Sequence, residues 1–296
     1  LRAGGVSRLQ DHLWAITAHP ERANAFAQSL GCELRPDALM TFEPTIGGRY
    51  SVWSACGLPI AIAHGADVFE QLLVGAAAMD AHFCAAPLAR NVPVLLALLT
   101  IWYTNFWGVR ARAVMPYARQ LRTLPAYLQQ LEMESAGKRV DRSGQLIDYD
   151  TTPIVWGDEG TTAQHSVFQF LHQGTHWLPV DFIVNRAFAQ SREPRQRLLY
   201  LSALAQADAL AFGDTVLPTP SQQPRPTWAQ APGNRPSTLI ELPQIDASAL
   251  GALLALYEHR TFVTTVLWDI NAFDQWGVEI GKKLLALRLQ QQESIP

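Results

Sequence analysis

Apolar residues recur along the chain at two different spacings, one typical of strands and one typical of helices. Residues 12–17 (HLWAIT) predict a short buried strand, and residues 20–30 predict a helix because a proline opens the segment. Three longer apolar segments are too extended for strands and predict helices at 51–64, 66–84 and 92–106. The first third of the chain is therefore expected to hold one strand and helix followed by a buried helical layer.

From Arg110 onward, strand patterns alternate with helix patterns. Strands are predicted at 111–117, 152–158, 178–184 and 238–242, and helices at 124–138, 161–173, 194–213, 248–267 and 274–291. This alternation predicts a parallel sheet with helices on both faces and ligands at the carboxyl ends of the strands. Residues 215–237 are rich in proline and predict a loop.

Composition restricts the kinds of partner that the protein can have. The chain has 296 residues, of which 48% are hydrophobic and only 17% charged, with a formal net charge of -3. Such a surface offers little to a nucleic acid or an anionic membrane. The uncharged run at 91–109 contains Pro93 and several polar residues, so it predicts a buried helix rather than a membrane span. Neither nucleic acid nor membrane is expected as a partner.

The cysteines and the first residues bear on cellular location. Cys32, Cys56 and Cys84 are odd in number and lack paired spacing, which indicates a reducing compartment. The segment at 1–14 carries charge where a signal peptide would be apolar, and no initiator methionine is present. We therefore expect a cytoplasmic protein whose sequence here begins inside a longer chain.

Two carboxylates, Glu132 and Glu134, lie near the end of a predicted helix that Gly137 would terminate. Residues two apart point to roughly opposite sides of a helix, so at most one of the two is catalytic. The local sequence leaves two roles open for Glu134, a salt bridge to Lys138 or a catalytic base.

A histidine follows the segment Gly157-Asp158-Glu159-Gly160. Thr161 and Gln164 have the spacing of a capping box, which would place His165 in the first turn of a helix. The helix dipole there would keep the imidazole neutral and able to exchange a proton, although a structural, hydrogen-bonded histidine is the alternative.

Metal and nucleotide cofactors are not expected. His172 and His176 are separated by Gly174, which interrupts the predicted helix, and HExxH and CxxC patterns are absent. The sequence also lacks a Gly-x-Gly-x-x-Gly segment and a Walker A loop.

Two further segments could bind a polar ligand. Gly47, Gly48 and Arg49 precede a helix that Ser51 could cap, and this arrangement suits an anion, although an ordinary turn with a surface arginine fits equally well. Near the end of the chain, Asn271 and Asp274 could cap a helix on which Gln275 and Lys282 share one face. A solvated polar stripe would give the same pattern.

Four blocks together resemble the phosphoglucose isomerase family, in the order that the family has them. They are GGRYSVWSACGLPIA at 47–61, LEMESAGK at 131–138, GDEGTTAQHSVFQFLHQGTH at 157–176 and WDINAFDQWGVEIGK at 268–282. The resemblance extends over essentially the whole chain and implies α/β/α sandwiches of the sugar-isomerase (SIS) type. It implies the tail of a first SIS domain with connecting helices at 1–96, a second domain at 97–270 with its proline-rich loop at 215–237, and a C-terminal helix at 271–296.

The same resemblance implies the reaction, the interconversion of glucose 6-phosphate and fructose 6-phosphate through a cis-enediolate, without metal or cofactor. Glu134 would move the proton between C2 and C1, and His165 with Lys282 would assist ring opening. Arg49 would stabilise the enediolate, and Gly48 and Gln275 would line the sugar site. It also implies a homodimer in which the histidine reaches the neighbouring subunit's site.

Departures from the family pattern leave alternatives open. Ala136 replaces the usual asparagine, TTAQH varies from the commoner TNGQH or TNAQH, and the family's Ser/Thr-rich phosphate loop, typically SKTFTT, is expected before Leu1. Without that loop the 6-phosphate has no evident cradle. The alternatives to a complete isomerase are an inactive fragment or a sugar-phosphate-binding SIS module, and the isomerase half of a transaldolase fusion.

Overall fold

The computed structural model describes residues 8–217 and 225–293, and the chain divides into two compact units, 1–73 and 74–296. The boundary between the units lies within helix α3 (Ala66–Ala85). The domain limits expected at 96 and 270 stay a prediction.

The first unit contains little regular structure. Its elements are η2 (Leu9–His12), β1 (Ala15–Thr17), α1 (Pro20–Ser29), η3 (Pro36–Ala38), β2 (Leu39–Thr41), η4 (Gly48–Tyr50), η5 (Ala55–Gly57) and α2 (Leu58–His64). Strands β1 and β2 pair in parallel. The predicted strand at 12–17 is real but shorter, and it is only partly buried rather than buried.

The helix predicted at 51–64 was wrong in its first half, because α2 begins only at Leu58. The Ser54 side chain accepts a hydrogen bond from the Cys56 amide and starts a short 3-10 turn instead. At Gly57 an added Cβ would lie 2.4 Å from the Val52 carbonyl oxygen, so the chain folds tightly back on itself there. Apolar density alone does not reveal such a turn.

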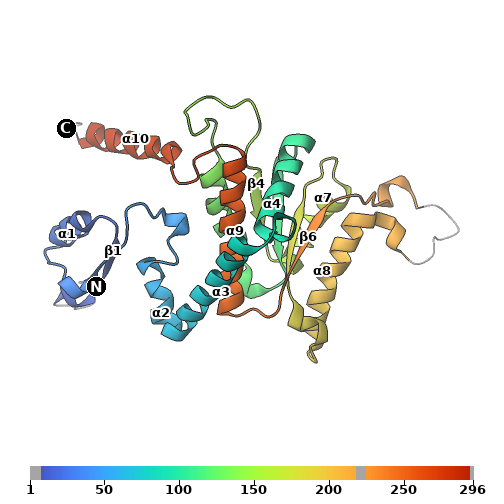
Figure 1. The fold of residues 1–296 in the computed structure, drawn as a ribbon, viewed down its shortest axis with the longest axis horizontal. Helices are drawn as coiled ribbons and strands as arrows, with labels where there is room; N and C mark the ends of the chain where they lie inside the picture. Colours follow the sequence, from blue (N-terminus) through green and yellow to red (C-terminus); the bar gives the residue numbers. More distant parts are fainter. Residues whose placement is uncertain (1–7, 218–224, 294–296) are drawn as a thin grey trace. The chain divides into compact units, whose positions relative to one another are not determined.

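The second unit is built on a four-stranded sheet (Figure 1). Its strands are β3 (Ala111–Pro116), β4 (Ile154–Gly157), β5 (Val180–Asn185) and β6 (Ser237–Leu242). They are ordered β4-β3-β5-β6 and all pair in parallel. This confirms the parallel sheet that the alternating pattern predicted.

Helices cover both faces of this sheet, as expected. They are α4 (Val92–Ile101), α5 (Leu124–Leu128), α6 (Gly160–Ala163), α7 (Phe168–Gln173), α8 (Pro194–Phe212) and α9 (Ala247–Leu267), with α10 (Trp276–Glu293) following. In Figure 1, α4 and α9 lie on one side of the strands and α8 on the other.

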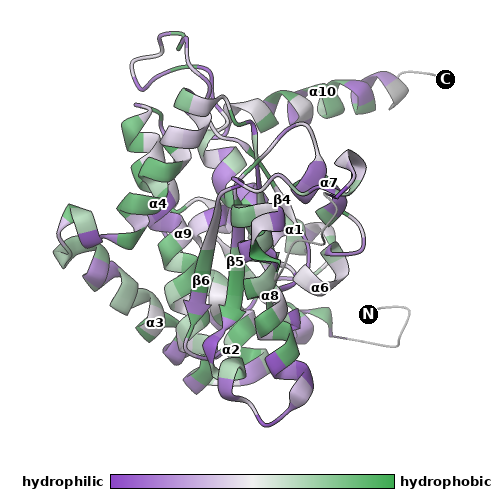
Figure 2. Cartoon of the chain, turned by 90° about the vertical axis from the view of Figure 1, so that its right-hand side faces the viewer, coloured by the Kyte–Doolittle hydropathy of each residue, from purple (hydrophilic) through white to green (hydrophobic). Residues whose placement is uncertain are grey.

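The two faces of the sheet have different chemistry because side chains alternate along a strand. Ala113, Met115 and Phe182 point into an apolar core shared with α7 and α8. Their neighbours in sequence, Arg112 and Asp181, point to the opposite face and interact with Arg260 and Tyr257 of α9. Figure 2 shows β5 and β6 as largely hydrophobic strands among the helices.

The two predicted helices that carry Glu134 and His165 are interrupted. The segment at 124–138 begins as α5 and then widens into the π-helix η9 (Gln129–Glu134). The segment at 161–173 is divided into α6 and α7 by a turn at 164–167. Both interruptions lie beside residues that the sequence marked as candidates, and π-turns such as η9 are frequent at functional sites.

Helix α4 and the π-turn η7 (Trp102–Phe106) expose an apolar face, so the expectation of a buried helix at 91–109 was only half right. The exposed side chains include Leu95, Leu98, Leu99, Trp102 and Phe106, and α4 is mostly hydrophobic in Figure 2. Among the described residues, no helix combines the length and the apolarity that a bilayer crossing requires.

The proline-rich segment at 215–237 lies partly outside the described residues, because these omit 218–224. Its described parts contain the end of η11 (Gly213–Val216), the short turn η12 (Thr227–Ala229) and the first residue of β6.

Candidate active site

Glu134 is the last residue of the π-helix η9, and its side chain is partly exposed. Gln130 donates a hydrogen bond from Nε2 to Glu134 Oε2 at 3.3 Å. Glu132, two positions earlier, is buried and bonded to Arg112. The structure therefore agrees with the prediction that the two carboxylates do not form a facing pair.

Glu134 lies on the wall of an open cleft of ≈ 980 Å³. The lining residues come from η9 and the segment after it, from the edge strand β4 and from the start of α10; they include Gln130, Met133, Glu134, Lys138, Asp141, Ile154, Trp156, Asn271, Asp274, Gln275 and Trp276. The cleft thus runs along β4, with Ile154, Val155 and Trp156 in its wall. The expectation of ligands at the carboxyl ends of the strands stays a prediction.

A lysine joins two of the segments that form this cleft. Lys138 Nζ donates to the carbonyl oxygens of Ser135 (2.8 Å) and Asn271 (2.5 Å) and lies 3.2 Å from Asp274 Oδ1. The ammonium is therefore held between the end of η9 and the turn that precedes α10. This contact explains how Glu134 and Gln275, which are far apart in sequence, come to line one cleft.

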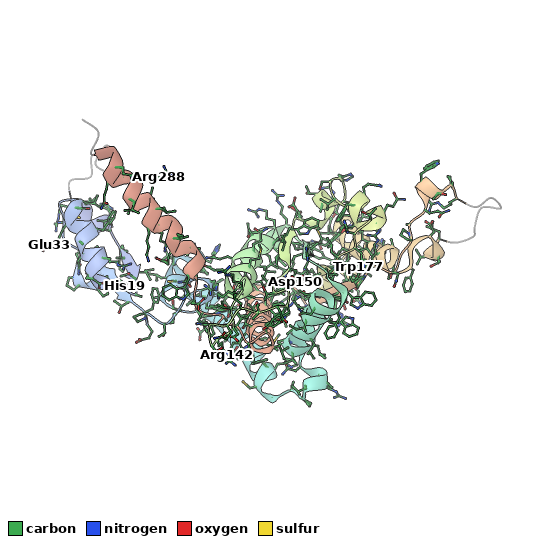
Figure 3. The ribbon with its side chains drawn as sticks, turned by 90° about the horizontal axis from the view of Figure 1, so that it is seen from above. His19, Glu33, Arg142, Asp150, Trp177 and Arg288 are labelled. Atoms are coloured by element: carbon green, nitrogen blue, oxygen red, sulfur yellow. The ribbon has the colours of Figure 1, made fainter. Side chains whose placement is uncertain are left out.

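The loop between η9 and β4 closes another side of the cleft through Arg139, Val140 and Asp141. Arg142 on this loop donates to Asp269 Oδ1 at 2.5 Å, and Asp150 forms a 3.4 Å ion pair with Arg110. Figure 3 labels Arg142 and Asp150, which lie in this part of the second unit.

Gln275 and Lys282 do not share a helical face, so that expectation was wrong. Helix α10 begins at Trp276, one residue after Gln275, and in the preceding turn Asn271 Nδ2 donates to Asp274 Oδ2 at 3.0 Å. Lys282 lies further along α10, is exposed, and forms a 2.7 Å ion pair with Glu279. Among the described residues, the cleft wall includes Gln275 but not Lys282.

His165 lies in the turn between α6 and α7 and is exposed. It is not in the first turn of a helix as predicted, because α6 begins at Gly160 with Glu159 at its N-cap and ends at Ala163. The capping box is also absent, since the cap makes no side-chain hydrogen bond. In the described structure His165 is not part of the cleft wall.

The glycines before His165 fix the path of this loop. A Cβ at Gly157 would lie 1.9 Å from the Val114 carbonyl oxygen, and one at Gly160 would lie 2.1 Å from the Tyr117 ring. Only glycine allows the chain to pass so close to β3 at these two positions. The loop that carries His165 is thereby held against the end of the central strand.

Gly48 and Arg49 belong to the first unit, in the 3-10 turn η4. Arg49 is buried, which excludes the ordinary surface arginine as an alternative, and its guanidinium lies 5.5 Å from the Tyr50 ring centroid. Ser51 does not cap a helix as expected, because its hydroxyl donates to the Gly48 carbonyl oxygen at 2.7 Å.

His172 contacts Gln206 at 2.7 Å through Nε2. Within residues 8–217 and 225–293, His, Cys, Asp and Glu side chains do not gather into a group of three or more that could hold a metal ion.

Sequence reasoning missed a buried ion network behind the cleft. Arg112 bonds Glu132 and Asp181, and Arg260 bonds Asp181 at 3.0 Å; all four side chains are almost fully buried. A signal was present, because Arg112 and Asp181 interrupt apolar strand runs where a charge is costly. Burial alone would lower the pKa of Arg112, but Glu132 and Asp181 outweigh it and raise that pKa further.

A parallel sheet covered by helices on both faces is consistent with the α/β/α sandwich of the sugar-isomerase type that the sequence predicts. The phosphoglucose isomerase family model matches residues 2–294, and the chain belongs to this family.

Individual relatives agree with this assignment. A glucose-6-phosphate isomerase from Methylibium petroleiphilum is 47% identical over 95% of this chain and 54% of its own length. One from Stenotrophomonas maltophilia is 50% identical over 93% of the chain and 52% of its own length. The crystal structure of a glucose-6-phosphate isomerase from Chlamydia trachomatis has a TM-score of 0.80 at 33% identity, covering 93% of this chain and 57% of that one. The chain thus spans about half the length of the curated relatives that it matches.

Proposed function

We propose that the protein is an aldose-ketose isomerase that interconverts glucose 6-phosphate and fructose 6-phosphate through a cis-enediolate, as a cytoplasmic enzyme of glycolysis and gluconeogenesis. The observation that carries this proposal is the position of Glu134, a partly exposed carboxylate on the wall of a cleft wide enough for a hexose phosphate. A carboxylate in this position can act as a general base toward a C–H proton beside a carbonyl.

Other residues complete the proposed chemistry. The fixed positive charge of Arg49 stabilises the oxyanion of the enediolate, since a buried guanidinium needs little reorganisation. Gly48 and Gln275 line the sugar site, and Gln275 shares the cleft wall with Glu134. The substrate is a hexose 6-phosphate, and the reaction takes no metal or cofactor.

We propose a homodimer in which each active site is shared between subunits. Two observations support it: His165 is exposed and outside the cleft wall of its own chain, and the apolar face of α4 and η7 is exposed. A solvent-exposed apolar surface of this kind favours burial against a protein surface.

The active site includes His165 and Lys282, which together assist ring opening, so a His165→Gln variant is expected to depend on the form of its substrate. We expect it to lose turnover of cyclic glucose 6-phosphate while keeping turnover of the open-chain form, because only the cyclic form needs a proton moved at the ring oxygen. Rapid mixing with substrate enriched in the open-chain form measures this difference. An equal loss on both forms would contradict the assigned role.

A specific observation favours a second candidate, a sugar-phosphate-binding module. The chain spans 54% of the Methylibium relative, and the Ser/Thr-rich phosphate loop of the family pattern is not among its residues, so the chain by itself would keep groups that contact the sugar without the donors that orient the phosphate for turnover. The anchoring of the 6-phosphate by such a segment supplies orientation as well as affinity.

The deciding experiment is an assay of glucose 6-phosphate to fructose 6-phosphate conversion on two forms of the protein. One form is the 296-residue chain, and the other is the same chain extended upstream to the length of its relatives. Turnover by the joined form supports the isomerase, and turnover by the shorter form as well means that the phosphate loop is dispensable. Sugar-phosphate binding without turnover in either form would favour the binding module.

A further inference from the structure

A buried arginine lies directly behind the helical turn that carries Glu134. Arg112, on β3, donates through Nη2 to Glu132 Oε1 at 2.5 Å and through Nη1 to Asp181 Oδ2. The side chains of Arg112, Glu132 and Asp181 are 2%, 6% and 3% exposed. Charges this deeply buried persist only when they are paired, so the contacts are obligatory in the folded protein.

The network is balanced in charge and anchored to several elements. Arg260, on α9, donates to Asp181 Oδ2 at 3.0 Å and to Thr100 Oγ1 of α4 at 2.8 Å. Tyr257 donates its hydroxyl proton to the same Asp181 oxygen at 3.2 Å. Two arginines therefore face two carboxylates, and Glu132 is the member that lies on η9.

Glu132 and Glu134 lie on opposite sides of the same turn. Because residues two apart on a helix point in roughly opposite directions, fixing the Glu132 side chain in the core fixes which way Glu134 points. The turn is a π-helix, which is rare and usually a single turn, so contacts from outside the helix must maintain it. Lys138 holds the other end of the turn through Ser135 and Asn271.

We propose that the Arg112–Glu132 ion pair positions the catalytic carboxylate: Arg112 holds Glu132 in the core and so aims Glu134 into the cleft. Arg112 and Glu132 are positioning residues that do not touch the substrate. This inference rests on the proposed isomerase function, in which Glu134 moves the proton. A misplacement of about 1 Å in such a group can cost on the order of 100-fold in rate, so loss of the pair lowers kcat and leaves KM nearly unchanged.

The test is a double variant, Arg112→Met with Glu132→Leu, made in the form of the protein that is active in the isomerase assay. Removing both partners leaves Arg260 paired with Asp181, and replacing a buried ion pair by apolar side chains of similar volume is often neutral for stability. We expect Tm within a few degrees of wild type, KM within about threefold and kcat lowered at least about tenfold. Hydrogen exchange at 129–137 should be faster.

A second variant keeps the test decisive if the double variant does not fold. Glu132→Asp keeps the negative charge opposite Arg112 but shortens the side chain by one methylene, which pulls the turn toward Arg112 or lengthens the ion pair. We therefore expect kcat to fall with KM unchanged. The matched control is Arg110→Met with Asp150→Asn, which removes an exposed ion pair at the start of the same strand. The Arg110 side chain is 81% exposed and the Asp150 side chain 53%, so kcat should stay unchanged.

The outcomes separate the two proposals. If wild type isomerises glucose 6-phosphate and Glu134→Gln does not, the proposed function stands and the positioning role can be judged. A folded Arg112/Glu132 variant with wild-type kcat would then overturn the positioning role alone. If wild type shows no isomerisation, or Glu134→Gln turns over normally, it is the proposed function that fails.

Discussion

Replacing Glu134 by glutamine is expected to lower kcat for the interconversion of glucose 6-phosphate and fructose 6-phosphate by roughly 10²–10⁴-fold, the usual contribution of a general base. The amide has nearly the shape of the carboxylate but cannot accept the C2 proton. Because Glu134 is partly exposed on the cleft wall, the substitution leaves the packing of η9 intact. KM is expected to change little, since the substrate loses no phosphate or hydroxyl contact.

The measurement is the steady-state rate, together with exchange of the substrate C2 proton with heavy water, which reports proton transfer directly. Glu70→Gln, at an exposed position of α3, provides a matched control with the same chemical change and should behave as wild type. Turnover and exchange at the wild-type rate in Glu134→Gln would exclude Glu134 as the base and would require another group in the cleft.

The sheet and most helices of the second unit could be predicted from the sequence because their signals are local. Strand β5 is buried on both faces and is apolar from Val180 to Val184 apart from Asp181; burial on both faces gives strands of parallel sheets their largely apolar character. Proline at the start of α8 and Asp246 at the N-cap of α9 mark helix boundaries in the same local way. Such signals need no knowledge of the tertiary structure.

The interruptions could not be predicted because they depend on contacts distant in sequence. The break between α6 and α7 follows a loop whose Gly157 and Gly160 lie against β3, and η9 widens where Glu132 meets Arg112. An apolar pattern of helical spacing is the same whether or not such contacts exist. The predictions of a continuous helix at 161–173, and of His165 in a first turn, failed for this reason.

Only part of the candidate site could be predicted from the sequence. Local pattern could separate Glu132 from Glu134 by direction, but it could not identify which one faces solvent. The juxtaposition of Glu134 with Gln275 follows from tertiary contacts such as that of Lys138 with Asp274, two residues far apart in the sequence. The family resemblance indicated these residues, whereas local spacing gave a different and incorrect geometry for Gln275 and Lys282.

Asp181→Asn is expected to destabilise the second unit strongly, by about 3–5 kcal/mol, the usual cost of removing one partner from a buried ion pair. Asp181 accepts from Arg112, Arg260 and Tyr257, so the substitution leaves two buried guanidinium groups with Glu132 as the remaining carboxylate of the network. Urea unfolding of the active form, followed by circular dichroism, measures the change. Asp269→Asn removes an exposed ion pair with Arg142 and should cost less than about 1 kcal/mol.

The same carboxylate predicts how stability depends on pH. Burial alone would raise the pKa of Asp181, but Arg112 and Arg260 outweigh it and lower that pKa in the folded protein. Its stabilising contribution is therefore complete above the unfolded-state pKa of about 3.9 and is lost as the pH falls below it toward the lower folded-state value. We expect the unfolding free energy of wild type to decline through this acidic range more steeply than that of Asp181→Asn. Parallel acid dependences in the two proteins, or a loss below about 1 kcal/mol at neutral pH, would show that Asp181 is not the charge on which the network depends.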